Sequence, residues 1–228
     1  MIGGSASLAL LIAATIRAFL FQPFSIPSSA LAPTVLAGDY VFVSKFPYGY
    51  SRFSLPPGEA SFKGRTPGAS PQRGDVVVFK LPKDERTDYI KRITGLPGDK
   101  IQLIDARLYI NGNEVAREPM SDYRTTDADG RATAVPHYLE TLPNGVSHEI
   151  IQKDGDTGYW SNTDVYSVPP DCYFMMGDNR DNSQDSRVLS EVGYVPLDNI
   201  EGRAEIIYFS VDPDRGLPRF DRFFQRVR

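Results

Sequence analysis

Asp75-Val76-Val77-Val78-Phe79 and Tyr40-Val41-Phe42-Val43-Ser44 are the two stretches that decide the fold class. Both are runs of β-branched and aromatic residues flanked by Gly and Pro, a pattern typical of β-strands. The 228-residue chain also contains 18 Pro, 19 Gly, 12 Tyr and 13 Phe, a composition that favours a turn-rich β-fold. We therefore predict an all-β domain.

Similar strand patterns occur further along the chain. Tyr173–Met176 and Ala204–Val211 are predicted strands. Ile101–Val115 is a predicted hairpin with Asn111-Gly112 as its turn, because Asn-Gly suits the positive φ angles of a two-residue turn. Ser51–Gln72, by contrast, is rich in Ser, Pro and Gly, which predicts a long surface loop.

Polar residues and turns replace the strand pattern between Glu118 and Ser167. We expect a small inserted subdomain here, at about residues 104–170, within a domain that extends over residues 24–228. The last ten residues, Arg219–Arg228, mix arginines with phenylalanines. Two interpretations remain open for them: a contact with a membrane surface, or a segment docked on the sheet by its phenylalanines.

The N-terminal segment is apolar from Ala6 to Ile16, is interrupted by Arg17 and continues to Phe21. A cleaved signal peptide, a core helix and a membrane span are the competing interpretations. A signal peptide begins with basic residues, and residues 1–7 contain none. A span needs about 20 apolar residues, a length that is reached if Arg17 extends to the membrane interface. We expect residues 1–23 to form one N-terminal transmembrane helix.

Charge and metal-ligand spacing exclude several classes of function. The formal net charge of −4 gives no basic field, so nucleic acid is not an expected partner. His137 and His148 lack the spacing of metal ligands. We expect neither a metal nor a cofactor.

Three segments carry the functional signal. Residues 24–34 read Phe-Ser-Ile-Pro-Ser-Ser-Ala-Leu-Ala-Pro-Thr, and residues 88–92 read Asp-Tyr-Ile-Lys-Arg before Gly95-Leu96-Pro97-Gly98-Asp99. Residues 177–187 read Gly-Asp-Asn-Arg-Asp-Asn-Ser-Gln-Asp-Ser-Arg. The last string alternates Asp and Asn like a calcium loop. An EF-hand needs Gly at its sixth position and Glu at its twelfth, where this chain has Ser183 and Leu189.

Together the three segments resemble the active-site boxes of type I signal peptidases, the bacterial leader peptidases that use a Ser/Lys dyad. The first is close to the family pattern F-x-I-P-S-x-S-M-x-P-T, and Pro27, Ser28, Pro33 and Thr34 hold the register. The resemblance covers most of the chain apart from roughly Glu118–Ser167. It implies a β-fold of mainly antiparallel sheets that follows directly on a membrane helix.

The resemblance also assigns roles to residues. Lys91 matches the general base, which must be neutral and therefore needs a pKa lowered by burial. Ser183 matches the serine that orients the lysine amine, and we expect the two within hydrogen-bond reach, with the amine within about 4 Å of the Ala30 methyl group. Residues of the supporting ion-pair network are matched by Arg92, Asp185 and Arg187.

The substrate site follows from the same comparison. Ser28 matches a hydroxyl donor of the oxyanion hole. Two shallow pockets for the small side chains at −1 and −3 of a signal peptide, and the strand that lines them, are matched by Phe24, Ile26, Leu31, Val35, Val41, Val78, Asp88 and Ile90. The substrate would bind as an added strand.

The nucleophile position is occupied by Ala30, which has no hydroxyl group. If residues 28–30 are extended, alternate side chains share a face, so Ser29 points away from Lys91. Ser28 then faces the lysine but lies about 6–7 Å along the strand, beyond the reach of the reaction. Neither serine is a convincing replacement.

The expected function is that of a membrane-bound serine endopeptidase that cleaves signal peptides from exported preproteins after small-x-small (Ala-x-Ala). The alternative is a catalytically silent paralogue or Ser-to-Ala variant that binds signal-peptide-like strands without cleaving them. The expected partners are signal peptides and the lipid bilayer. The expected location is the inner (cytoplasmic) membrane, single-pass, with the catalytic domain on the extracytoplasmic side.

Overall fold

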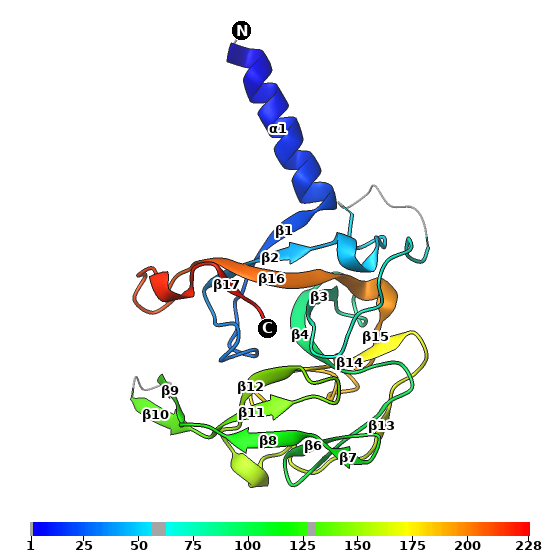
Figure 1. The fold of residues 1–228 in the computed structure, drawn as a ribbon, viewed down its shortest axis with the longest axis vertical. Helices are drawn as coiled ribbons and strands as arrows, with labels where there is room; N and C mark the ends of the chain where they lie inside the picture. The colour runs from blue at the N-terminus through cyan, green and yellow to red at the C-terminus, as the bar shows by residue number, and fades with distance from the viewer. Residues whose placement is uncertain (1, 56–62, 127–130) are drawn as a thin grey trace.

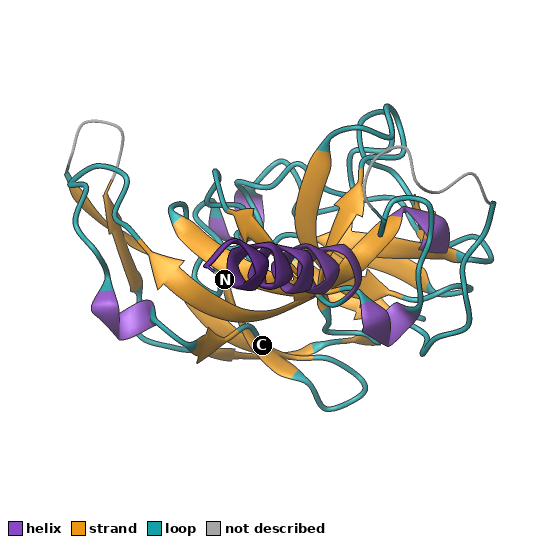
Figure 2. Ribbon diagram, turned by 90° about the horizontal axis from the view of Figure 1, so that it is seen from above, coloured by secondary structure: helices purple, strands orange, loops and turns teal. Residues whose placement is uncertain are grey.

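The computed structural model describes residues 2–55, 63–126 and 131–228. Strands dominate this part of the chain (Figure 2). Its helical segments are α1 (Ile2–Phe19), η1 (Phe46–Tyr48), η2 (Gly155–Thr157), η3 (Leu197–Asn199) and η4 (Phe220–Arg222). The predicted all-β fold class of the main domain is confirmed.

An eight-stranded antiparallel sheet forms the upper body of the molecule, next to α1 (Figure 1). Its order is β1-β2-β16-β3-β4-β14-β15, and β17 pairs with the second half of β16. The strands are β1 (Phe21–Ser25), β2 (Asp39–Ser44), β3 (Val76–Lys80), β4 (Asp88–Gly95), β14 (Cys172–Met176), β15 (Val195–Pro196), β16 (Ile200–Ser210) and β17 (Gln225–Arg226).

Three smaller sheets form the lower body in Figure 1, in the orders β13-β5-β6-β7, β12-β11-β8 and β10-β9. Their strands are β5 (Lys100–Ile104), β6 (Arg107–Ile110), β7 (Asn113–Glu114), β8 (Ala116–Pro119), β9 (Tyr123–Thr126), β10 (Ala132–Val135), β11 (His137–Thr141), β12 (Ser147–Ile151) and β13 (Tyr166–Ser167). The described strands of residues 100–126 and 131–167 thus pair among themselves, and none of them pairs with a strand of the large sheet. We refer to them as the lower module.

The strands predicted at residues 40–44, 75–79, 173–176 and 204–211 correspond to β2, β3, β14 and β16. The hairpin prediction was incomplete. Asn111-Gly112 is a turn with positive φ at both residues, but it joins β6 to β7. The turn between β5 and β6 is Asp105-Ala106, which also has two positive φ angles despite the Cβ of Ala106. Ala is not a turn residue by composition, so the pattern concealed this second turn.

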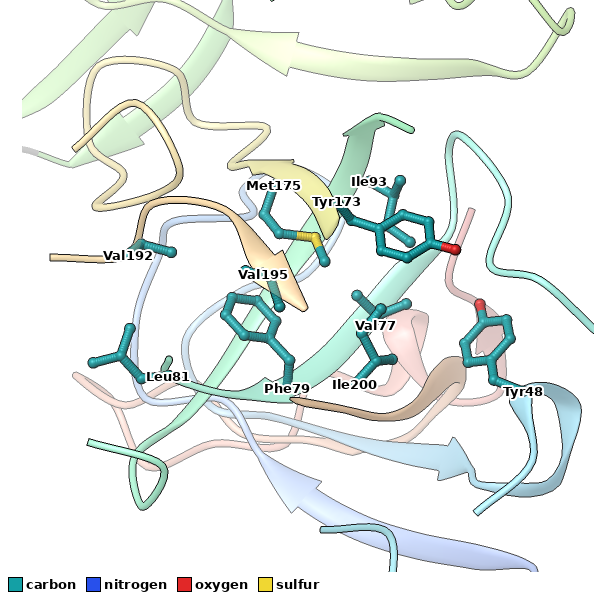
Figure 3. Close-up of a cluster of buried hydrophobic side chains, with 10 residues drawn as sticks. All are labelled: Tyr48, Val77, Phe79, Leu81, Ile93, Tyr173, Met175, Val192, Val195 and Ile200. Carbon is teal, nitrogen blue, oxygen red and sulfur yellow. The ribbon is translucent and has the colours of Figure 1, made fainter. Parts of the chain in front are cut away.

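The core of the large sheet lies between β3, β4 and the β14–β15 pair. Ten buried side chains meet there, among them Phe79, Ile93 and Met175, which are fully shielded from solvent (Figure 3). Tyr48 and Tyr173 close one side of this cluster (Figure 3). Burial of these side chains on one face fixes the register of β3 against β4.

The N-terminal helix differs from the prediction for residues 1–23. It ends at Phe19, and residues 21–23 already belong to β1, whose Phe21 pairs with Ser44 of β2. The pairing of β1 with β2 thus begins where the helix has ended. Pro23 could not continue the helix in any case, because it has no backbone N–H. Among the helices of residues 2–55, 63–126 and 131–228, none has the length and hydrophobicity of a membrane-crossing segment.

The C-terminal segment docks on the large sheet through arginines and through Phe223, whose ring centre lies 5.1 Å from that of Phe209 on β16. Arg219 and Arg222 both pair with the fully buried carboxylate of Asp39, and β17 adds to β16. Phe220 and Phe224 remain 73% and 71% exposed. The arginines therefore anchor this segment, while two of its phenylalanines face solvent.

Candidate active site

Lys91 lies at the centre of the candidate site, on β4. Its side chain is only 4% exposed, although the strand begins with the exposed Asp88. No hydrogen bond or ion pair joins it to another described residue, and its Nζ lies 5.5 Å from the ring centre of Tyr89. Burial lowers the pKa of Lys91 to about 8, against the raising effect of the carboxylates of Asp185 and Asp178. A neutral amine is thus accessible near neutral pH.

The expected hydrogen bond between Lys91 and Ser183 is not formed. The Ser183 Oγ atom is buried and has no partner in the described part of the chain. A Cβ added at Gly177 would overlap both Ser183 Oγ and the Ala30 carbonyl oxygen, which shows that these two oxygen atoms lie close together. Ala30 supplies no side-chain hydroxyl that could pair with Ser183 Oγ.

The segment around Ala30 is a series of turns and not the extended strand assumed above. Ala32 N–H donates to Ser29 O and Val35 N–H to Leu31 O, so alternate side chains do not share a face here. Ser28 is exposed. The prediction that Ser29 points away is therefore unfounded.

The turn segment is fastened to residues 177–187 by several hydrogen bonds. Asn179 N–H donates to the Ala30 carbonyl (3.1 Å), and the Asn182 amide donates to Ser29 Oγ (3.1 Å). Thr34 Oγ1 donates to Asp178 Oδ2 (2.6 Å). Two of the three sequence segments thus lie against each other in the structure, and Ala30 is 8% exposed between them.

The predicted pocket residues do come together. One apolar cluster contains Ile26, Leu31, Val35, Val41 and Val78, with Phe24 and Ile90 packed at its margin. Most of these side chains are fully buried, so Phe24 and Ile90 are the members that remain accessible to a ligand. Sequence reasoning missed Val227 of the C-terminal segment, which packs against the same cluster. Asp88 instead forms an ion pair with Lys80 on the strand edge.

The supporting network consists of separate ion pairs. Arg187 binds Asp185 through two nitrogens (both 2.8 Å), and these interactions lower the pKa of Asp185 although burial alone would raise it. Arg92, fully buried, binds Asp178 through Nε (2.8 Å) and Nη2 (2.7 Å). Asp178 was missed, although its place in the Gly177–Arg187 string was a usable signal.

A second group of missed residues comes from the lower module. Arg180 binds both carboxylate oxygens of Glu140 on β11, one at 2.9 Å. His148 on β12 lies beside this pair and is 3% exposed. The backbone of β12 also continues into the site, since Ile151 N–H donates to Asp178 O and Arg180 N–H donates to Ile151 O (both 3.0 Å). No pattern in the sequence pointed to Glu140.

Two cavities of the molecule lie away from Lys91. One of about 610 Å³ lies between the end of α1 and the sheet, near Lys45 and Glu201. Another of about 610 Å³ borders β16 and the C-terminal residues 226–228. Neither is lined by a residue of the candidate site other than Val227.

Comparisons with known proteins identify the family of this chain. A family model described as signal peptidase, peptidase S26, matches residues 2–209. The chain is 42% identical over 214 residues to a signal peptidase I of Rickettsia prowazekii (strain Madrid E), covering 91% of this chain and 79% of the relative. It belongs to the signal peptidase family S26. This family consists of serine endopeptidases.

A second relative and a solved structure are also similar to this family member. A signal peptidase I of Rickettsia typhi (strain ATCC VR-144 / Wilmington) is 43% identical over 206 residues, covering 87% of this chain and 76% of the relative. A crystal structure of a signal peptidase I from Enterococcus faecalis V583 is 27% identical, covers 59% of this chain and 97% of that one, and superposes with a TM-score of 0.35.

Proposed function

We propose that this signal peptidase family member binds the signal peptides of exported preproteins as an added strand beside β4 and selects small side chains at −1 and −3. With Ala30 in place, the chain binds these signal peptides without cleaving them. Lys91 is the general base of the site, Ser183 its orienting partner and Ser28 an oxyanion-hole donor. Ala30 lacks the side-chain oxygen that would attack the peptide bond.

The burial of Lys91 carries this proposal. An ordinary strand lysine is solvated and paired, whereas Lys91 is 4% exposed and has no carboxylate within 4 Å among the described residues. A pKa of about 8 suits a base that must accept a proton near neutral pH. Burying a cation without a partner is costly, and the family's chemistry supplies a reason for it.

The remaining parts of the site support binding. The backbone N–H of residue 30 can still donate to an oxyanion, because Ala30 changes only the side chain. Phe24 and Ile90 form an accessible apolar margin over a buried cluster, which suits small side chains. The swap of the family's Met for Leu31 nearly conserves volume.

We extend the proposal to location. α1 exposes apolar side chains, with Leu8, Leu10, Leu11 and Ile12 between 51% and 72% exposed, and Arg17 follows them. Such a segment favours association with a bilayer. The orientation, with the catalytic domain on the extracytoplasmic side of the inner membrane, is carried over from the family resemblance. Residues 24–228 would then be the catalytic domain, with its inserted subdomain at about 104–170.

The decisive experiment compares the rates at which this chain and its Ala30→Ser variant cleave, in detergent, a preprotein whose signal peptide ends in Ala-x-Ala. We expect the variant to cleave at least about a thousandfold faster, because nucleophile-dependent sites lose most of their rate with the hydroxyl. Ala32→Ser, which adds the same group two residues away, is the matched control. Equal rates for the two proteins would overturn the proposal, and Ser28→Ala and Ser29→Ala would then identify the hydroxyl in use.

Binding is tested separately by calorimetry with an Ala-x-Ala peptide and the unaltered chain. Ala30 leaves the apolar margin and the strand edge in place, so heat of binding should be measurable. The absence of any heat at millimolar peptide would contradict a binding role.

A further inference from the structure

The hairpin of β11 and β12 carries two His–Glu pairs with opposite environments. Glu140 and His148 face each other across the two strands, and their side chains are 1% and 3% exposed. His137 and Glu149 also interact (Nε2–Oε2 2.9 Å), but the Glu149 side chain is 47% exposed. These are the two histidines of the chain, and only His148 faces the candidate active site.

His148 lies between the carboxylates of two separate ion pairs. Its Nε2 is 3.5 Å from Oε2 of Glu140 and 3.9 Å from Oδ1 of Asp178. Glu140 is bound to Arg180 and Asp178 to Arg92, and all five side chains are at most 4% exposed. Neither ring nitrogen of His148 has a hydrogen-bond partner among the described residues.

The charge of this cluster determines the state of the histidine. Two arginines and two carboxylates balance, so a neutral imidazole leaves the cluster neutral, whereas an imidazolium would add an unbalanced buried charge. Burial, reinforced by Arg92 and Arg180, lowers the pKa of His148 well below 6.5. With its proton on Nε2, the neutral ring presents the positive end of an N–H dipole to the two carboxylates, at distances longer than a hydrogen bond.

The cluster is connected to residue 30 by short steps. Asp178, one neighbour of His148, accepts the hydrogen bond of Thr34 Oγ1 (2.6 Å). The next residue, Asn179, donates its N–H to the Ala30 carbonyl (3.1 Å). A displacement of Asp178 would therefore move the backbone that holds the nucleophile position.

We propose that His148 is a positioning residue of the active site, whose neutral ring lies between Glu140 of the lower module and Asp178, with Nε2 facing both carboxylates, and so holds the segment that contacts residue 30. The inference rests on the proposed function for its catalytic meaning. It gives the lower module a role in the site, because β11 and β12 provide both His148 and Glu140.

Proton NMR of the unaltered chain tests the state of His148. The His137→Gln variant leaves a single histidine signal, which assigns His148 without ambiguity. We expect that signal to keep the shift of a neutral ring from pH 8 down to about pH 5. Titration near pH 6.5 would overturn the proposal, because a histidine that charges freely does not bridge two balanced ion pairs.

Kinetics in the Ala30→Ser background tests the positioning role. His148→Leu removes the donor at similar size, and His148→Gln keeps a neutral N–H donor at the same distance along the side chain. We expect His148→Leu to lower kcat about tenfold or more with KM changed less than about twofold, and His148→Gln to recover most of the rate. His137→Leu, on the other face, is the matched control.

The outcomes separate the two proposals. If Ala30→Ser cleaves and His148→Leu matches His137→Leu in kcat, the positioning role is wrong. A loss of thermal stability without a loss of kcat would also contradict it. If Ala30→Ser does not cleave at all, the proposed peptidase chemistry fails. The positioning role is then decided by the backbone NMR signals of Ala30 and Asn179, which should shift in His148→Leu and stay unchanged in His148→Gln if the histidine holds that segment.

Discussion

Lys91 and Arg92 are consecutive residues on β4, both buried cations, and their surroundings are opposite. Arg92 binds both oxygens of Asp178, the Gly74 carbonyl and the Arg228 carbonyl. Among the described residues the Lys91 side chain has no such partner, and Ser183 Oγ is equally unpaired. Arg92 thus belongs to a completed hydrogen-bond network, whereas Lys91 and Ser183 Oγ lack hydrogen-bond partners in the described part of the chain. Unsatisfied buried groups of this kind are common at sites of catalysis.

Under the proposed function, this contrast identifies the part of the family's site that has changed. Loss of a nucleophile removes one oxygen, but the supporting ion pairs and the buried lysine remain in place. A site in decay would be expected to pair or expose its lysine, since doing so relieves an unfavourable burial. Keeping Lys91 buried indicates that the surrounding structure still imposes the arrangement.

The largest test of this contrast removes the amine. In the Ala30→Ser variant, Lys91→Met should lower cleavage of an Ala-x-Ala preprotein by about a thousandfold or more, because the serine then has no base. The rate is measured in detergent over several hours. Lys80→Met, on the neighbouring strand, is the control, and equal losses from both substitutions would show that Lys91 has no special role.

The next largest effect concerns the completed network. Asp178→Asn leaves Arg92 buried without a charged partner, so the free energy of unfolding should fall by about 3–5 kcal/mol. Asp88→Asn removes one of the two carboxylate partners of Lys80, in an ion pair that is partly exposed, and should cost less than about 1 kcal/mol. Urea denaturation measures both, and similar losses would contradict the distinction between the two pairs.

Removing the charge of Lys91 is expected to have a smaller effect on the free energy of unfolding, and one of opposite sign. Between pH 8 and about 10.5 the unfolded chain holds more protons on Lys91 than the folded chain, because the pKa of the folded state is about 8. The free energy of unfolding should therefore rise with pH in this window. At pH 7, Lys91→Met should be more stable than the parent by about 2–3 kcal/mol. A destabilised variant, or one whose pH dependence is unchanged, would contradict the lowered pKa.

The smallest effect is expected at Ser183. Its hydroxyl has no partner, so Ser183→Ala in the unaltered chain should change the free energy of unfolding by less than about 1 kcal/mol, in the stabilising direction. Ser186→Ala is the control, since Ser186 Oγ accepts a hydrogen bond from Met175 N–H (2.8 Å) and its loss should destabilise. Equal effects at the two serines would show that Ser183 is bonded after all.

Sequence patterns were most reliable where the signal is local. Runs such as Val76–Phe79 predict strands because a pleated, buried surface favours β-branched residues wherever the strand lies in the sheet. Lys91 was found because its box has a specific local order. The turns at residues 28–35 were not found, since they form against the 177–187 segment, and neighbours far along the chain decided their shape.

The sequence by itself determined the β-fold class, the three boxes and the absence of a hydroxyl at residue 30, since each of these is a property of consecutive residues. Only the tertiary structure decided that Asp178 is the partner of Arg92, that Val227 reaches the apolar cluster, and that Glu140 and His148 stand behind the site. Asp178 is separated in the chain by 86 residues from Arg92, and it lies tens of residues beyond His148. Which of several buried charges pair depends on how the sheets stack, and no local pattern carries that information.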